Sequence, residues 1–213
     1  MDIFGLSITR LNHDCFKIQG SKLIYFDPFQ IQKGEAADYL FITHEHQDHL
    51  SPQDIEKVSD THTIIITIPS CLKRVLSLKV ADIKVMEPTN RLELPGTTVE
   101  TIAAYNINKY RSEGLVFHPK DDGRVGFIIT LDGVRIYHAG DTDAIEEMKT
   151  LRDIDIALLP VSGTYVMTAE EAAMAAGWIK AKITIPMHYG AIVGTDDDAR
   201  RFAEKAAVKT LIL

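Results

Sequence analysis

The chain has 213 residues, a length that fits one large α/β domain, and we expect residues 1–213 to form a single domain. Lysine and arginine total 23 against 30 aspartates and glutamates, and this net charge of −7 argues against a broadly basic surface for long nucleic acids or anionic membranes. Hydrophobic residues make up 46% of the chain and charged residues 25%, a globular composition that excludes wholesale disorder.

The sequence carries no sign of a membrane or secretory segment. No apolar run approaches the roughly 20 residues of a membrane-spanning helix, and the first residues lack the basic stretch and apolar core of a signal peptide. We therefore expect a cytoplasmic protein. Cys15 and Cys71 lack the Cys-x-x-Cys spacing of redox or zinc motifs, so we expect buried, reduced thiols.

The first half of the chain predicts several strands, followed by an alternation of helices and strands. Short apolar runs separated by turns predict strands over residues 6–11, 15–18, 23–26 and 39–43. Ser51 and Pro52, followed by Asp54, are typical of a helix start. Further periodicity predicts strands over residues 62–68, 83–86 and 98–104 and a helix over residues 70–78.

The second half repeats this alternation after a polar stretch over residues 106–124. Asp132 and Gly133 predict a tight hairpin between strands over residues 125–131 and 134–137. Thr168 and Thr195 each begin a capping-box pattern, which predicts helices over residues 168–179 and 195–206. The remaining predicted strands cover residues 154–160, 183–187 and 210–213. The alternation indicates an α/β fold.

Four potential metal ligands stand within six residues, directly after the strand predicted to end at residue 43: His44, His46, Asp48 and His49. A random chain of this composition contains this pattern roughly once in a thousand cases, so it is a specific motif. Ligands bind in open α/β sheets at the carboxyl ends of strands, and the motif lies between a strand end and a helix start. The alternation of side chains lets His44 and His46 face one ion while Asp48 and His49 face a second.

Two more predicted strand ends carry a possible ligand. Asp141 follows the strand over residues 134–137 and stands beside Gly140, which allows a metal to approach the backbone closely. His188 follows the strand over residues 183–187. These strand ends form one site only if the sheets place them on the same rim.

Together with Asp27 at the end of an early strand, these motifs resemble the metallo-β-lactamase superfamily over nearly the whole chain. The segments around Asp141 and His188 are similar to the branch that includes L-ascorbate-6-phosphate lactonase-like proteins. The resemblance implies an α/β (α+β) fold, a four-layer αββα sandwich with the metal site at one edge of the β-sandwich. It assigns the first metal to His44 and His46, the second to Asp48, His49 and His188, and the bridging position to Asp141.

The chain departs from the family pattern at one ligand. A third histidine for the first metal should follow the strand over residues 98–104, but Asn106 stands there instead. Three alternatives follow. Either Asn106 ligates the first metal through its carbonyl oxygen, or His118 completes the site from the loop, or the first site is weak or empty. If neither is a ligand, both are candidates for substrate recognition.

The other singled-out side chains are assigned to supporting roles. Asp27 is expected to orient a ligand imidazole, because metal-bound histidines normally donate their second N–H to a carboxylate or carbonyl. His138 either contacts the substrate or a metal ligand at the edge of the site, or is a core histidine whose ring nitrogens both have hydrogen-bond partners. His13 and His62 are assigned to structure.

Nitrogen and oxygen ligands without thiolate suit up to two divalent ions, Zn²⁺, Mn²⁺ or Fe²⁺. The predicted function is a metal-dependent hydrolase, in which a metal-bound hydroxide attacks an ester, lactone or phosphoester of a small anionic substrate. Asp48 and Asp141 are the predicted catalytic residues, since they hold the ions and the hydroxide. The stretch over residues 105–120 also supplies three cations, Lys109, Arg111 and Lys120. They either clamp a phosphate or carboxylate or belong to a solvated loop.

Three alternatives stay open. A phosphodiesterase or nuclease would use the same dinuclear site, although the charge of −7 argues against long polymers. A non-catalytic protein would bind metal for stability or regulation, and a di-iron oxidoreductase is the remotest case. We expect a small-molecule substrate, no long nucleic acid and no membrane partner; a homo-oligomer is compatible with the sequence.

Overall fold

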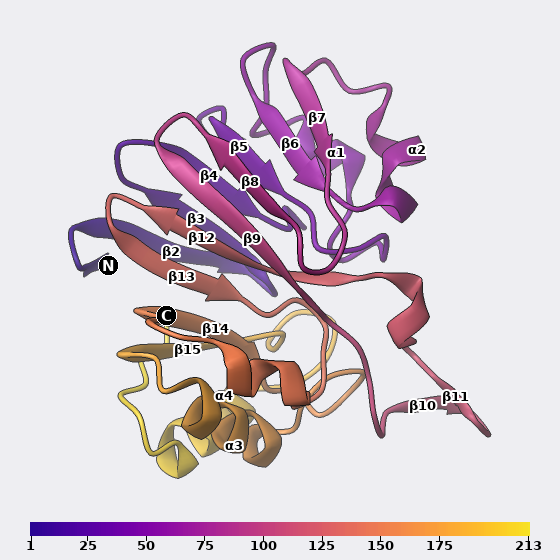
Figure 1. Cartoon of the computed structure of the whole chain (residues 1–213), viewed down its shortest axis with the longest axis vertical. Helices are drawn as coiled ribbons and strands as arrows, with labels where there is room; N and C mark the ends of the chain where they lie inside the picture. The colour runs from indigo at the N-terminus through magenta and orange to yellow at the C-terminus, as the bar shows by residue number, and fades with distance from the viewer.

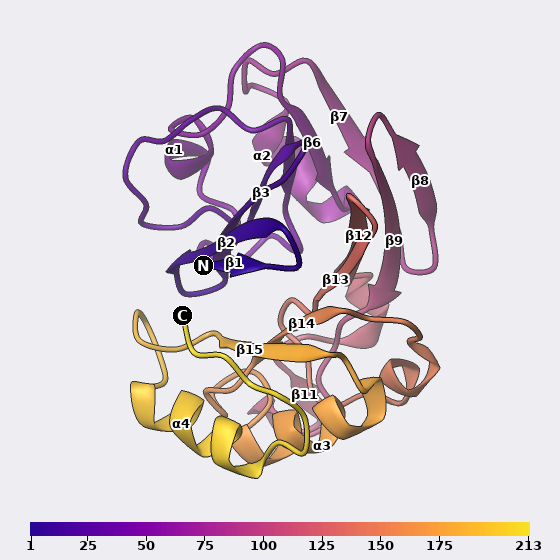
Figure 2. The same cartoon turned by 90° about the vertical axis from the view of Figure 1, so that its left-hand side faces the viewer.

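Two β-sheets pack face to face at the centre of the computed structural model, which describes residues 1–213 (Figure 1). Helices α1 (Pro52–Ile55) and α2 (Leu72–Val75) lie against the seven-stranded sheet. Figure 2 shows α3 (Ala169–Ile179) and α4 (Asp196–Lys205) below the outer face of the six-stranded sheet. The layers are therefore those expected for the αββα sandwich.

The first sheet has the strand order β1-β2-β3-β4-β5-β6-β7. Its strands are β1 (Asp2–Ile3), β2 (Leu6–Asn12), β3 (Cys15–Gln19), β4 (Leu23–Phe26), β5 (Tyr39–Phe41), β6 (Ile64–Thr67) and β7 (Asp82–Val85). Strands β1 to β4 pair antiparallel, and β4 to β7 pair parallel. Because Phe26 of β4 pairs with Phe41 of β5, the residues that follow both strands leave the sheet at the same edge.

The second sheet has the order β15-β14-β13-β12-β9-β8. Its strands are β8 (Arg91–Leu94), β9 (Thr97–Ala103), β12 (Val125–Leu131), β13 (Val134–His138), β14 (Ile156–Pro160) and β15 (Ile183–Met187). Strands β13, β14 and β15 are parallel, so the segments after β13 and β15 also leave at one edge. Between β9 and β12, β10 (Tyr110–Ser112) and β11 (Leu115–Val116) form a two-stranded ribbon that projects from the body of the molecule (Figure 1).

The helices begin where the capping residues predict. Thr168 accepts a hydrogen bond from the backbone N–H of Glu171 in a complete capping box, and Thr195 forms a capping box before α4. Three 3₁₀ turns complete the helical segments: Pro69–Cys71, Lys120–Asp122 and Glu146–Thr150. None of the helices combines the length and the apolar composition needed to cross a membrane.

Two predicted elements differ from the structure. The helix predicted over residues 70–78 is reduced to a 3₁₀ turn followed by the single turn of α2. The strand predicted over residues 210–213 does not form, and Thr210 makes one isolated bridge to Thr184. Leu211 and Leu213 pack against the core, so the apolar pattern there reports packing without a strand ladder.

One cluster of 59 buried residues fills the space between the sheets and beneath the helices. At its centre, the ring of Phe41 lies 5.0 Å from that of Phe26 and 5.1 Å from that of Phe127, on the opposite sheet. Aromatic contacts of this kind fix the separation and register of the two sheets. The rigid sandwich thereby holds the loops at its edge in place.

Candidate metal centre

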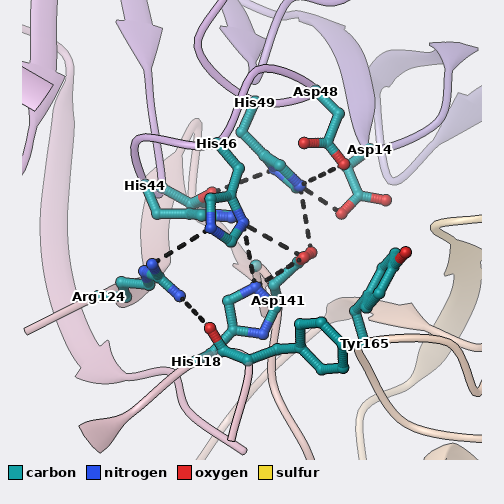
Figure 3. A network of polar contacts seen from close by, with 12 residues as sticks. Asp14, His44, His46, Asp48, His49, His118, Arg124, Asp141 and Tyr165 are labelled. Atoms are coloured by element: carbon teal, nitrogen blue, oxygen red, sulfur yellow. Dashed lines mark hydrogen bonds and ion pairs between the residues drawn. The ribbon is translucent and has the colours of Figure 1, made fainter. Parts of the chain in front are cut away.

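The ends of β5, β13 and β15 meet at one edge of the sandwich and bring all six predicted ligands together. Figure 3 shows the ligands other than His188. The donor atoms of one group lie within 4.8 Å of one another: His44, His46, His118 and Asp141. A second group meets the same limit: His13, Asp48, His49 and His188. The site therefore has two adjacent sets of donors, and a third, overlapping group joins Asp14 to His49, Asp141 and His188.

In the first group, the donor atoms have the spacing of ligands around a single ion. The Nε2 atom of His118 lies 3.3 Å from Asp141 Oδ2 and 3.3 Å from Nδ1 of His46. The Nε2 atom of His44 lies 3.8 Å from the same Asp141 oxygen. Metal–nitrogen bonds of about 2.0–2.1 Å in a tetrahedral site place donors roughly 3.3–3.4 Å apart.

The second group has the same spacing and shares Asp141 with the first. The Nε2 atom of His49 lies 3.6 Å from Asp48 Oδ2 and 3.2 Å from Asp141 Oδ1. The Nε2 atom of His188 lies 3.4 Å from Asp141 Oδ2. The Asp141 carboxylate thus lies between the two groups, in the place that a bridging ligand needs.

Asp27 and Thr43 determine which nitrogens of two histidines carry a proton. The Nδ1 atom of His49 lies 2.8 Å from Asp27 Oδ2, and an ionised carboxylate only accepts, so Nδ1 is the donor. The Thr43 hydroxyl donates to Asp27 at 2.7 Å and therefore accepts from Nδ1 of His44 at 3.1 Å. Both Nε2 lone pairs are left to face the centre, which is the tautomer of a metal ligand.

His188 is oriented in the same way from the second sheet. The Ser162 hydroxyl donates to the carbonyl oxygen of Thr164 at 3.2 Å and accepts from Nδ1 of His188 at 2.9 Å. The Nε2 atom of His188 is again left without a proton. Asp27 therefore takes the orienting position that the sequence predicted for it, and Ser162 is an orienting residue that the sequence did not reveal.

The donor set fits divalent cations. The Nε2 atoms of His44, His49 and His188 and the Oδ1 atom of Asp141 are buried without a hydrogen-bond partner. Such atoms are rare in folded proteins, because each one costs about 1–3 kcal/mol. A cation at the centre of each group supplies the missing partner.

The charges of the site agree with this interpretation. Four carboxylates surround the centre: those of Asp14, Asp27, Asp48 and Asp141. The only ionic neighbours of these carboxylates within 4.0 Å are histidines. Several buried negative charges without a lysine or arginine are strongly unfavourable. Two divalent ions would neutralise them.

Burial and neighbouring charges set the protonation of the donors. Burial lowers the pKa of His44 well below its usual value, and burial followed by the Arg124 charge lowers the pKa of His46. Burial alone would raise the pKa of Asp141, but the imidazoles of His188 and His49 hold it well below its usual value. Burial alone would lower the pKa of His49 and of His188, but the Asp141 carboxylate raises both. Metal binding needs neutral imidazoles and an ionised carboxylate, so an ion bound there would displace a proton from these two histidines.

Where the chain departs from the family pattern, the structure brings His118 to the first donor group and engages the Asn106 amide elsewhere. The Asn106 side chain donates through Nδ2 to the carbonyl oxygen of Tyr165 at 2.8 Å. Its Oδ1 accepts from the backbone N–H of His118 at 3.0 Å and lies 2.8 Å from Nδ1 of the same residue. The amide oxygen thus holds His118, whose Nε2 faces Asp141 and His46.

His138 is not brought into the donor groups. Its Nε2 atom lies 2.9 Å from the carbonyl oxygen of Asp14, its Nδ1 accepts from the backbone N–H of Gly140, and its ring stacks on Phe26 at 4.7 Å. Both nitrogens are satisfied inside the core. The structure thus places His138 in the core, outside the donor groups and outside the lining of the cavity beside them.

The sequence analysis missed several residues at the site. His13, which we assigned to structure, and Asp14 enter from the turn between β2 and β3. Arg124 lies beside the first group. It pairs with Glu45, and its Nη2 atom lies 3.3 Å from Nε2 of His46. No motif marks these residues, because each comes from a segment distant in the chain.

A cavity of about 280 Å³ opens onto the centre and is lined by His46, Asp48, Arg111, Phe117, His118, Asp141 and Tyr165. The rings of Phe117 and Tyr165 meet edge to face at 4.6 Å and form its apolar wall. A larger cavity of about 960 Å³ lies at the opposite rim, around Trp178 and Arg152, and contains none of the donor groups. The smaller cavity is therefore the one that lies beside the candidate metal centre.

Of the cations in the polar stretch after β9, only Arg111 faces this cavity without an internal partner. Lys109 forms ion pairs with Asp143 and Glu171. Lys120 pairs with Glu147 and lies over the ring of Tyr105. The sequence alone does not distinguish these cations. In the structure, Arg111 is unpaired and lines the cavity, where it can bind an anion.

Sequence comparison agrees with the geometry. Residues 7–188 match the model of the beta-lactamase superfamily domain. The UPF0173 metal-dependent hydrolase of Methanoculleus marisnigri is 34% identical over 190 residues, covering 86% of this chain and 81% of that protein. The UPF0173 metal-dependent hydrolase of Methanocorpusculum labreanum is 32% identical over 213 residues, covering 97% and 94%.

Solved structures share the fold. A candidate metal-dependent hydrolase from Parabacteroides distasonis superposes with a TM-score of 0.85 and 33% identity, covering 97% of this chain and 92% of that one. A metallo hydrolase from Ignicoccus hospitalis superposes with a TM-score of 0.75 at 20% identity, covering 98% and 94%, and supports the fold alone. The fold class predicted from the sequence is confirmed.

Proposed function

Since this chain belongs to the metallo-β-lactamase superfamily, and within it to the UPF0173 metal-dependent hydrolases, we propose that it hydrolyses an ester, lactone or phosphoester of a small anionic substrate. The L-ascorbate-6-phosphate lactonase-like branch that the sequence motifs indicated stays a prediction. The observation that carries the proposal is the set of buried, unpartnered Nε2 atoms that converge beside an open cavity.

In this proposal, the ligands divide between two metal positions. His44, His46 and His118 would hold the first ion, Asp48, His49 and His188 the second, and Asp141 would reach both. Bound there, Zn²⁺, Mn²⁺ or Fe²⁺ would supply a water activated for attack and would polarise the carbonyl or phosphoryl group of the substrate. Nitrogen and oxygen donors without thiolate suit all three ions.

Asp48 is the ligand carboxylate nearest to solvent, because 21% of its side chain is exposed in the cavity. Burial alone would raise its pKa, but the imidazoles of His13 and His49 lower it to about 2. A carboxylate that stays ionised at neutral pH accepts hydrogen bonds and does not give up protons. Asp48 would therefore orient the attacking water toward the substrate.

Arg111 supports the choice of an anionic substrate. It lies on the exposed β10 strand, lines the cavity and forms no ion pair with a carboxylate within 4.0 Å. A planar guanidinium binds carboxylate or phosphate oxygens through paired hydrogen bonds. The cavity volume of about 280 Å³ is at the lower limit for ligand pockets, which favours a small molecule.

The test is a substrate panel with the protein stripped by a chelator and reloaded with Zn²⁺, Mn²⁺ or Fe²⁺. Each ester and lactone is supplied as a neutral and an anionic version, and a bis-aryl phosphate, which is itself an anion, represents the phosphodiesters. We expect hydrolysis only after reloading, with lower KM for the anionic versions. A protein that binds the ions tightly and hydrolyses nothing would be the non-catalytic metal-binding protein, and a preference for the bis-aryl phosphate would favour the phosphodiesterase.

Arg111→Ala tests the substrate class within the same panel. Loss of a charge-assisted contact worth about 1.5–3 kcal/mol should raise KM for the anionic versions by about 10- to 100-fold and leave the neutral versions unchanged. Arg91→Ala is the control, because Arg91 is an exposed arginine on β8 that does not line the cavity. An equal effect of Arg111→Ala on both versions would contradict recognition of an anion.

A further inference from the structure

His13 and Asp14 form the turn between β2 and β3, and no role in the proposed function explains them. Both residues are completely buried, and neither ring nitrogen of His13 nor either carboxylate oxygen of Asp14 has a hydrogen-bond partner. Buried polar atoms normally find partners, because leaving them unpaired is costly. Four such atoms on adjacent residues indicate a partner that the protein chain does not provide.

The His13 ring faces the other three residues of the second donor group. Its Nε2 atom lies 3.4 Å from Asp48 Oδ2, without making a hydrogen bond. Its ring centroid lies 4.1 Å from that of His188 and 6.1 Å from that of His49. The 3.4 Å separation is within the 3.2–3.6 Å range found between the other donors of this group.

The backbone holds His13 in this orientation against local strain. His13 has φ of 43° and His188 has φ of 60°, in the left-handed region that residues other than glycine seldom adopt. Strained conformations of this kind persist where the surroundings enforce them, and they gather at functional sites. Both residues point their side chains toward the same group of donors.

Arg10 is the residue that enforces this arrangement. Its guanidinium donates to the carbonyl oxygen of His13 at 3.0 Å and to that of Tyr189, and it lies 3.8 Å over the Tyr189 ring. The backbone N–H of His188 also donates to the carbonyl oxygen of His13, at 3.4 Å. These hydrogen bonds connect the turn between β2 and β3 in the first sheet to the end of β15 in the second sheet.

We propose that His13 is a further protein ligand of the second metal position, beside Asp48, His49 and His188, and that the negative charge of Asp14 strengthens this position. The inference rests on the proposed function, because it requires a second ion. With Asp141, the second position has five protein donors and the first has four. Zn²⁺ favours four ligands in most sites, so the second position should favour an ion that takes five or six, such as Mn²⁺ or Fe²⁺.

The test compares His13→Ala with the parent protein after both are stripped and dialysed against Co²⁺, whose visible spectrum reports the number and kind of its ligands. We expect two ions per parent chain and a second ion bound about 10- to 100-fold more weakly by the variant, with a changed spectrum. Added imidazole should restore both. His62→Ala is the matched control, because the His62 side chain is 90% exposed, and it should bind and absorb like the parent.

A competition between Mn²⁺ and Zn²⁺ completes the test, since His13→Ala should lose preference for Mn²⁺ at the second position. Unchanged Co²⁺ affinity in the variant overturns the proposal. Weaker binding with an unchanged spectrum also overturns it, because His13 would then only position Asp48. If His13→Ala fails to fold by circular dichroism, His13→Gln replaces it with the same criteria. A parent that binds one ion refutes the two-ion function, and His13 is then supported only if the variant loses that ion.

Discussion

Asp27→Asn should weaken metal binding without removing any metal ligand. Asparagine has the same shape and tolerates the left-handed backbone that Asp27 adopts, with φ of 40°. Its oxygen can still accept from the backbone N–H of Thr43, as Asp27 Oδ1 does at 2.8 Å. Its NH₂ group, however, replaces the oxygen that accepts from Nδ1 of His49 and from the Thr43 hydroxyl.

The consequence is a wrong tautomer at His49. Two donors cannot face each other at 2.8 Å, so the proton of His49 moves from Nδ1 to Nε2. A protonated Nε2 has no lone pair for a metal. Loss of such an outer partner costs about 10- to 100-fold in metal affinity, or roughly 1.4–2.7 kcal/mol. His44 is reached only through Thr43, so the first position should lose less than the second.

The measurement is competition for Co²⁺ against a coloured chelator, with the two affinities resolved by titration. Thermal melting of the metal-free proteins separates metal binding from stability. Asp38→Asn is the matched control, because Asp38 also accepts from a backbone N–H, that of Leu23 at 2.8 Å, but lies outside the donor groups. Parent affinities at both positions in Asp27→Asn would refute the assignment of the tautomer to Asp27.

Two further predictions concern the body of the protein. Phe127→Ala should lower the free energy of unfolding in urea by about 3–5 kcal/mol, because its fully buried ring packs on Phe41 between the sheets. Phe4→Ala, at a ring that is 48% exposed, should change it by less than about 0.5 kcal/mol, and equal losses would contradict the packing argument. Burial raises the pKa of the Cys71 thiol to about 11, so about one molecule in a thousand is thiolate at pH 8. Iodoacetamide should label Cys71 only after unfolding, as mass spectrometry would show; rapid labelling of the native protein would contradict this.

Local features of the fold and the site could be predicted from the sequence because they depend on neighbouring residues. Turn and capping patterns around Thr168 and Thr195 determine helix starts within a few residues, and the structure has both. The motif after β5 is equally local, since His44 and His46 follow one strand end and leave the sheet together. Parallel pairing then brings this strand end to a common edge.

The residues that complete the centre depend on chain segments that only the tertiary structure brings together. His13 meets His188 because two sheets pack face to face, and no periodicity in either segment reports that contact. His118 joins the candidate metal ligands because the Asn106 amide, twelve positions earlier, holds its backbone and its ring.

Charge recognition shows the same division between sequence and structure. The sequence marks Lys109, Arg111 and Lys120 as equivalent cations on one polar stretch. Folding neutralises the two lysines with Glu171 and Glu147, which come from segments further along the chain, and leaves Arg111 facing the cavity. Residue type determines which charges the chain carries, but the electrostatic field at the site depends on distances between charges, and only the folded structure sets those distances.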